Sequence, residues 1–169
     1  MVLMPNWQQN GKLINKYQPG IKMETHDFTT TLLVDQSPNA VFNAVNQPQN
    51  WWSGEIEGSS SKLNDEFTYR YKDIHFSKQR VVEMIPDRKV VWQVIDSRLN
   101  FVENKDEWTG TEIIFEITPH DNQTQVRFTH CGLIPTGECY NDCSNAWSQL
   151  IRQGLFSLIT TGKSEEVFL

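Results

Sequence analysis

The sequence predicts an α+β fold in which a curved antiparallel β-sheet wraps around a long C-terminal α-helix. Six segments alternate apolar and polar residues with a period of two, which is typical of strands that bury one face. The largest apolar helical stripe lies in the last patterned segment, residues 143–163. Because each strand offers one apolar face and a single long helix must cover these faces, we expect the sheet to curl around that helix, as twisted sheets do.

The first patterned elements are a strand and two short helices. Residues 27–35 alternate as a strand does. In residues 37–45, Ser37 is suited to cap a helix and Pro38 to occupy its first position. The helical pattern breaks at Pro48, so we expect two short helices between the first strand and the rest of the sheet.

Five further strands and the C-terminal helix complete the predicted fold. The helix is roughly 20 residues long and therefore spans ~30 Å, enough to cross a sheet, and Gly162 marks its end. The acidic segments 55–57 and 106–107 are expected to be solvated loops. The strands are expected at residues 66–72, 75–85, 90–96, 111–118 and 124–131.

Length and charge limit the classes of protein to consider. A chain of 169 residues suits one domain, here residues 23–169, whereas residues 1–22 are polar and aperiodic and are expected to form a weakly ordered extension. The formal net charge of -6 argues against nucleic-acid binding, and no apolar run reaches the ~18 residues of a membrane span. The N-terminus lacks an apolar signal core and the cysteine count is odd, which favours a cytoplasmic protein.

The three cysteines, Cys131, Cys139 and Cys143, lie where the last strand joins the helix. Cys139 and Cys143 share a helix face, but tetrahedral zinc needs a second pair of ligands and none has the right spacing. We therefore expect no metal and no cofactor, and interpret the thiols as small apolar side chains. No nucleophile, phosphate-binding or dinucleotide-binding motif is present, so no residue is assigned as catalytic.

Aromatic residues dominate the candidates for a ligand site. A concave sheet and one helix can leave a cavity between them, and rings at 11% of the chain either fill it or line it. Trp51 and Trp52 lie between short elements, and one of the two is a candidate to line the mouth, while Tyr69 and Tyr71 are expected to face inward. The candidate ligand-binding residues are Trp51, Trp52, Tyr69, Tyr71, Trp92, Phe115, His130 and Trp147.

His130 has two interpretations. It shares the apolar strand face with Val126 and Phe128 and should therefore point inward. In the first interpretation it is a core histidine satisfied by a hydrogen bond. In the second it is a polar anchor for a ligand, and it could also act as an acid or base if its pKa lies near neutrality.

Several segments of the chain resemble one known superfamily. They are TTTLLVDQSPNAVFNAV, WWSGEIEGS, VVEMIPDRKVVWQV, EWTGTEIIFEITP, VRFTHCGL and ECYNDCSNAWSQLI with the later LITTGK, and together they cover roughly residues 24–163. The chain is similar to the START-type, birch-pollen-allergen-like (SRPBCC) proteins of the helix-grip fold. Within them it is similar to bacterial homologues of the activator of the heat-shock-protein-90 ATPase. The resemblance implies binding of lipids, polyketides or other hydrophobic molecules, with cyclase or hydrolase chemistry in some branches.

Three functional hypotheses result. The first is binding of a small hydrophobic molecule, lipid-like or aromatic, in a cavity between the sheet and the C-terminal helix. The second is a chaperone-linked interaction protein of the stress response, which binds a heat-shock-protein-90 partner through an exposed patch. The third is a cyclase-like or hydrolase-like enzyme that uses His130 as acid or base. Nucleic acid and membranes are not expected as partners, and the sequence leaves monomer and homodimer open.

Overall fold

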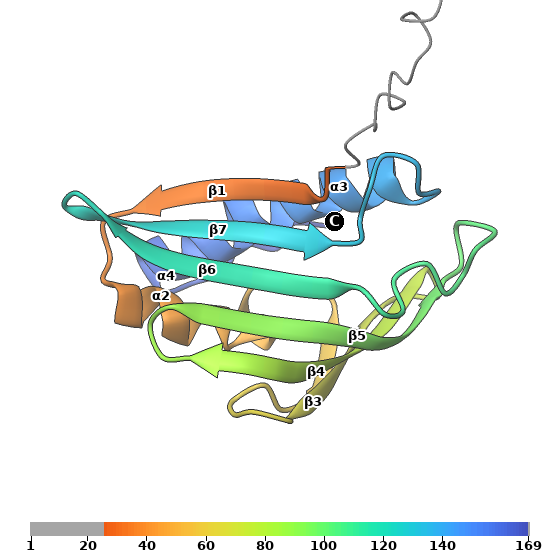
Figure 1. Cartoon of the computed structure of the whole chain (residues 1–169), viewed down its shortest axis with the longest axis horizontal. Coiled ribbons are helices and arrows are strands. Elements are labelled where there is room, and N and C mark those ends of the chain that lie inside the picture. Colours follow the sequence, from red (N-terminus) through yellow and green to blue (C-terminus); the bar gives the residue numbers. More distant parts are fainter. Residues whose placement is uncertain (1–25, 169) are drawn as a thin grey trace, which may run out of the picture.

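A computed structural model describes residues 26–168, and the expected extension at residues 1–22 lies outside this part of the chain. The centre of the described part is a seven-stranded sheet in the order β1-β7-β6-β5-β4-β3-β2 (Figure 1). Every neighbouring pair of strands is antiparallel. The strands are β1 (Phe28–Val34), β2 (Glu55–Gly58), β3 (Glu66–Tyr71), β4 (His75–Ile85), β5 (Lys89–Leu99), β6 (Glu112–His120) and β7 (Gln123–Cys131).

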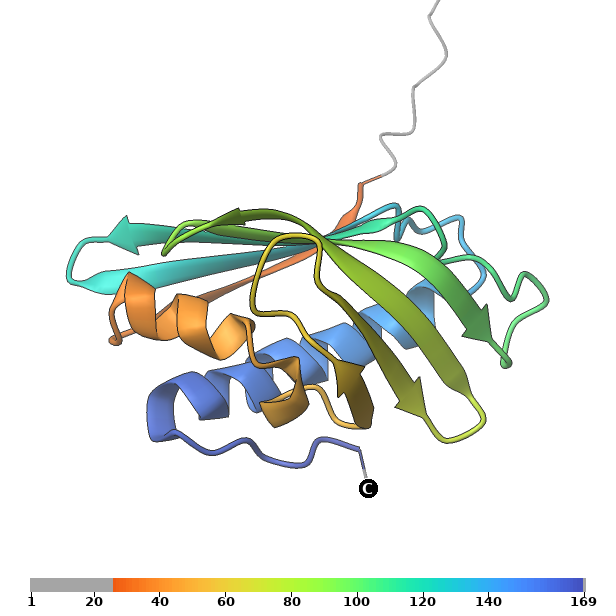
Figure 2. The same cartoon turned by 90° about the horizontal axis from the view of Figure 1, so that it is seen from below.

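The helices lie on the concave side of the curved sheet (Figure 2). The α+β helix-grip architecture predicted from the sequence is therefore confirmed. None of the helices within residues 26–168 is both long and apolar enough to cross a membrane. The helices are α2 (Pro38–Val45), the 3₁₀-helix η1 (Pro48–Asn50), α3 (Tyr140–Gln149), the π-helix η2 (Leu150–Leu155) and α4 (Phe156–Thr161).

Local signals in the sequence set the ends of these helices. Ser37 caps α2, because its Oγ accepts a hydrogen bond from the backbone N–H of Ala40 at 3.2 Å. Gly162 ends α4 in the left-handed conformation, with φ 78°. Both ends agree with the sequence-based expectation.

The acidic segment 55–57, expected to be a solvated loop, forms the edge strand β2 instead. Ile56 lies opposite Tyr69 of β3. The side chains of Glu55 and Glu57 are exposed. An edge strand pairs on one side only and is protected from further pairing by charges. Such a strand needs no run of buried residues, which is why the apolar pattern does not indicate it.

The long C-terminal helix contains a π-helical turn. The pattern predicts a helix at residues 143–163, and the structure forms one from Tyr140 to Thr161 with η2 in its middle. Gly154 lies in η2, where a Cβ atom would come within 2.6 Å of the backbone carbonyl oxygen of Trp51. The absence of a side chain thus lets the helix approach the segment that carries Trp51 and Trp52.

Replacing Gly154 by Ala should lower the free energy of unfolding by about 1–3 kcal/mol, because the added methyl group collides with the Trp51 carbonyl and forces the helix outward. Urea denaturation followed by circular dichroism measures the effect. Gln153→Ala is the control, since Gln153 is exposed in the same turn and its loss should change stability by no more than about 0.5 kcal/mol. A Gly154→Ala variant of unchanged or greater stability would contradict the close approach, because Ala is otherwise the better helix former.

Candidate functional site

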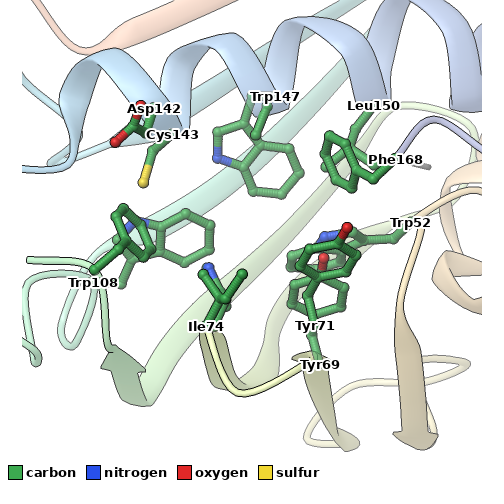
Figure 3. Close-up of a pocket in the computed structure, with 13 residues that line it drawn as sticks. Trp52, Tyr69, Tyr71, Ile74, Trp108, Asp142, Cys143, Trp147, Leu150 and Phe168 are labelled. Atoms are coloured by element: carbon green, nitrogen blue, oxygen red, sulfur yellow. The ribbon is translucent and has the colours of Figure 1, made fainter.

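A cavity of about 330 Å³ lies between the inner side of the sheet and α3 (Figure 3). Its walls come from the segment between η1 and β2, from β3, from the β3–β4 turn and the start of β4, from the loop between β5 and β6, and from α3, the first residue of η2 and the C-terminal tail. Aromatic and aliphatic side chains dominate these walls. The lining residues are Trp52, Tyr69, Tyr71, Ile74, His75, Phe101, Trp108, Asp142, Cys143, Ala146, Trp147, Leu150 and Phe168.

Five rings form a closed circuit in the lining, which we call the five-ring wall. Trp52 stacks on Tyr69, with 4.2 Å between the ring centroids. Tyr69 meets His75 edge-on at 5.1 Å, and His75 meets Trp108 edge-on at 4.4 Å. Trp108 stacks on Trp147 at 5.7 Å, and Trp147 returns to Trp52 at 5.0 Å. Since each ring touches two others, the wall presents one continuous aromatic surface to the cavity.

The eight candidate residues divide into two layers. Trp52, Tyr69, Tyr71 and Trp147 line the cavity. The other four are completely or almost completely buried and are not among its lining residues. This second layer supports the first: its Trp51 ring, for example, stacks on Trp52 with centroids 6.1 Å apart. The buried residues behind the wall are Trp51, Trp92, Phe115 and His130.

His130 is the centre of a buried hydrogen-bond chain. The indole Nε1–H of Trp147 donates to His130 Nδ1 at 3.0 Å. Because Nδ1 accepts, the proton of the neutral imidazole lies on Nε2, which donates to Thr111 Oγ1 at 2.8 Å. The Thr111 hydroxyl donates in turn to the carbonyl oxygen of Trp108 at 2.6 Å. One histidine thus connects β7 to α3 and to the loop before β6, orients the Trp147 ring directly and reaches the backbone of Trp108 through Thr111.

The environment of His130 keeps it neutral. Complete burial lowers the pKa of His130 to about 3, because a cation in this apolar core would lose its hydration. Both ring nitrogens already have partners inside the protein. The side chain therefore serves to position Trp147, and it offers neither a lone pair nor a proton to a molecule in the cavity.

His75 also lines the cavity, although it is not among the candidate residues predicted from the sequence. Its Nε2 lies 3.3 Å from Ser77 Oγ, which also accepts a hydrogen bond from Gln79 Nε2 at 2.5 Å. Burial lowers the pKa of His75 to about 3, so this imidazole is also neutral at physiological pH. The signal that could have identified it is the alternation of His75, Ser77 and Gln79 along β4, which places all three on the inner face.

The two tyrosines of the lining differ in their hydrogen bonds. The Tyr69 hydroxyl donates to the backbone carbonyl of Ser53 at 2.8 Å. Burial raises the pKa of Tyr69 above its usual value, so the phenol stays protonated. Tyr71 is half-buried, and its ring contacts that of Phe168 at 5.4 Å. Tyr71 is therefore the more accessible of the two phenols.

Two of the three thiols, those of Cys139 and Cys143, are buried at the start of α3, whereas Cys131 ends β7 and is half-buried. Trp108 Nε1–H donates to Cys139 Sγ at 3.3 Å, and both residues are buried. Cys143 lines the cavity, and its pKa is raised above the usual value, mainly by its hydrogen bond with Cys139 and then by burial. Within residues 26–168, no three His, Cys, Asp or Glu side chains are grouped so that they could hold a metal ion.

Glu107, expected in a solvated loop, instead holds the start of α3. Its Oε2 accepts a hydrogen bond from the backbone N–H of Cys139 at 2.8 Å. This N–H is among the first donors of the helix, which have no partner inside the helix itself. A carboxylate also stabilises the positive end of the helix dipole. The expectation of a free loop charge was wrong because the partner lies 32 residues away in the sequence.

The C-terminal tail closes one side of the cavity. Residues after Gly162 turn back beneath the helix (Figure 2). The backbone N–H of Val167 donates to Ser53 Oγ at 3.1 Å. This bond holds the next residue, Phe168, against Tyr71 in the cavity lining. The cavity lining therefore includes a residue from the C-terminal end of the described chain.

Stability should fall as the pH decreases below about 6.5, because His75 and His130 stay unprotonated in the folded state down to about pH 3 but take up protons in the unfolded state. Each histidine should contribute up to about 1.4 kcal/mol per pH unit between these limits. Urea denaturation at pH 7 and pH 5 measures the slope.

His130→Asn should reduce this pH dependence, because Asn cannot be protonated while its Oδ1 can still accept from the Trp147 indole. The variant should be less stable at pH 7, since the Thr111 contact is lost. Val126→Ala, a buried change without a titratable group on the same strand, should lower stability equally at both pH values. Equal stability of the unmodified protein at pH 7 and pH 5 would contradict the two buried neutral imidazoles.

Comparison with known proteins identifies relatives of the whole fold. A search of curated proteins found no match. Among solved structures, the chain is similar to the Aha1 dimer from Colwellia psychrerythraea, with a TM-score of 0.65 and 25% identity over 82% of this chain and 99% of that chain. It is also similar to a conserved protein of unknown function, EF2215, from Enterococcus faecalis, with a TM-score of 0.61 and 14% identity over 95% of this chain and 85% of that one. The latter likeness supports the fold alone.

The family is established by a sequence model rather than by the fold. The model described as Activator of Hsp90 ATPase homolog 1-like protein matches residues 35–158, from the residue after β1 to the middle of α4. That range includes most of the cavity lining and the complete hydrogen-bond chain around His130. The chain therefore belongs to the Activator of Hsp90 ATPase homolog 1-like family, within the START/SRPBCC superfamily.

Proposed function

We propose that the protein binds small hydrophobic, ring-containing molecules in the cavity beside α3. The observation that carries the proposal is the five-ring wall, which faces an unfilled volume of about 330 Å³. Ligand pockets are typically apolar hollows of ~300–1,000 Å³ with few polar groups, so this cavity suits a compact molecule. The family's superfamily, whose members bind hydrophobic molecules, gives further support.

The driving force is the removal of apolar surface from water. A ring system that buries about 200 Å² of its surface against the wall gains roughly 5 kcal/mol, from which the cost of immobilising the ligand is subtracted. The wall itself adds little to that cost, because Trp147 is fixed by His130 and Trp108 by Cys139. A pre-ordered site loses less conformational entropy on binding than a flexible one.

A polar contact would orient the ligand. His130 and Tyr69 already use their hydrogen-bonding groups inside the protein. Tyr71 and His75 line the cavity and are only half-buried, so they are the groups assigned to this role. The enzyme hypothesis that relied on His130 finds no support in this geometry, because both of its nitrogens are occupied.

A chaperone-linked role is the second candidate. It is favoured by the family description and by the likeness to the Aha1 structure, which is covered over 99% of its length. That structure is a dimer, so a homodimer is also proposed for this chain. An ATPase assay with a purified heat-shock-protein-90 homologue tests the role. Stimulation that survives blocking of the cavity would favour this candidate, and no stimulation at saturating protein would contradict it.

Ala146→Trp should weaken the binding of a neutral apolar probe at least tenfold, because the new indole occupies the cavity that Ala146 lines. The probe is N-phenyl-1-naphthylamine, whose emission rises in an apolar site, titrated into the full chain. Asn145→Trp is the matched control, since it adds the same indole at the adjacent, exposed position of α3 outside the lining.

The two variants together separate cavity binding from surface binding. The proposal predicts that Asn145→Trp binds the probe as the unmodified protein does. Equal binding by both variants and the unmodified protein would place the probe elsewhere and contradict the proposal. Failure of the unmodified protein to bind any neutral ring compound would contradict it as well.

A further inference from the structure

Asp142 gives the rim of the cavity a negative charge. It is the one charged side chain among the described residues that line the cavity. It lies in the first turn of α3, next to Cys143, and is exposed (Figure 3). Within residues 26–168 its carboxylate has no hydrogen-bond or salt-bridge partner. The lining thus combines aromatic surface with a single carboxylate that is available to a ligand.

The other charges near this end of the cavity do not neutralise Asp142. Glu107 Oε2 accepts from the backbone of Cys139, and Glu138 Oε2 accepts from the backbone N–H groups of Glu103 at 2.8 Å and Asn104 at 3.3 Å. The carboxylates of Glu103, Glu107 and Glu138, together with the exposed Asp106, make the electrostatic potential at this end of the cavity more negative. Among the lysines, Lys105 Nζ lies 3.5 Å from the carbonyl oxygen of Val102 in the same loop. The acidic side chains of this loop and of the segment before α3 therefore outnumber the loop's single basic side chain, Lys105.

The opposite side of the cavity carries a different charge. Lys72 Nζ lies 5.2 Å from the centroid of the Tyr71 ring. Figure 3 shows Tyr71 and Asp142 on opposite sides of the cavity. Lys72 itself is not part of the lining. The charge pattern is therefore directional, with the carboxylate at the α3 side.

The alternative explanation of Asp142 is that it only stabilises the helix. A carboxylate in the first turn interacts favourably with the helix dipole. At this helix, however, Glu107 already binds the Cys139 N–H, and Asp142 makes no capping hydrogen bond. A purely helical role also gives no reason for the side chain to lie in the lining of an aromatic cavity.

We propose that the cavity selects molecules that combine an aromatic body with a protonated amine, the rings lying against the five-ring wall and the ammonium group beside Asp142. The inference rests on the proposed function and names the ligand class for that site. The negative π-faces of tryptophan and tyrosine attract cations, and a carboxylate at the rim adds to this attraction. Carboxylate and phosphate ligands are disfavoured, because no Lys or Arg side chain lines the cavity within the described chain.

The charged group belongs at the rim and not at the bottom of the cavity. Apart from Asp142, no charged side chain of the described chain lines the cavity, so an ammonium group placed deeper would lose hydration without gaining a counter-charge. Asp142 is exposed, so an ammonium group beside it keeps part of its hydration. The orientation of the ligand follows: its ring system enters first and the amine stays at the opening.

Three probes with one skeleton test the inference: tryptamine (cation), tryptophol (neutral) and indole-3-propionate (anion). Isothermal titration calorimetry is done on the full chain at pH 7 and low salt. Tryptamine should bind roughly three- to fivefold more tightly than tryptophol, as an exposed ion pair allows. Indole-3-propionate should bind most weakly. At 0.5 M NaCl the preference for tryptamine should shrink, because salt screens exposed charges.

The variant Asp142→Asn should reduce the affinity ratio of tryptamine to tryptophol to about one. Asp106→Asn is the matched control, since Asp106 is an exposed acid at the same end of the molecule but outside the lining. It should leave most of the ratio intact. If both variants lose the affinity ratio equally, the role of Asp142 is overturned, because the selection then comes from the summed negative potential of all the acidic groups at this end of the molecule.

The outcomes separate this inference from the proposed function. If none of the three probes binds, the proposed function itself fails. If tryptophol binds as tightly as tryptamine to the unmodified protein, or indole-3-propionate binds most tightly, the cavity binds rings but the amine inference is overturned. If the ratio is present and is lost only in Asp142→Asn, the inference is supported.

Discussion

The hydrogen bond from the Trp147 indole to the buried imidazole of His130 is the contact on which the rest of the site depends. Through it the helix is fixed to the sheet, and through Thr111 the same histidine reaches the loop that carries Trp108. Without it the Trp147 ring would lose the hydrogen bond that fixes its orientation beside the cavity. A neutral histidine is suited to this position because it both accepts and donates, whereas a protonated one could not accept from the indole.

Most of the fold could be predicted from the sequence because its strands each bury one face. The alternation around Trp92 and Phe115 indicates strands, and the stripe that contains Trp147 indicates the helix. The π-turn could not be predicted, because Gly154 is indistinguishable in a sequence from any other helical glycine. The need for a glycine there comes from the close approach of the Trp51 backbone, which lies more than 100 positions away in the sequence.

The site was predicted less completely than the fold, for a geometric reason. Alternation tells which face of a strand is inside but not whether an inward side chain meets a cavity or another side chain. Trp51 and Trp52 are adjacent in the sequence, yet only Trp52 lines the cavity. His130 points inward as expected, but both of its ring nitrogens are already hydrogen-bonded inside the protein. Phe168 reaches the cavity lining through a C-terminal tail whose sequence has no helical or strand periodicity. Such placements depend on contacts between distant segments.

The connected tryptophans give the molecule a built-in optical reporter. Trp51, Trp52, Trp92, Trp108 and Trp147 form an unbroken series of ring contacts, none longer than 6.3 Å between centroids. At such spacing, excitation energy moves readily from one indole to the next, so the set emits nearly as one chromophore. A quencher that contacts one of these indoles would then lower the fluorescence of the whole set. Occupancy of the cavity could therefore be followed by the protein's own ultraviolet emission, without a label.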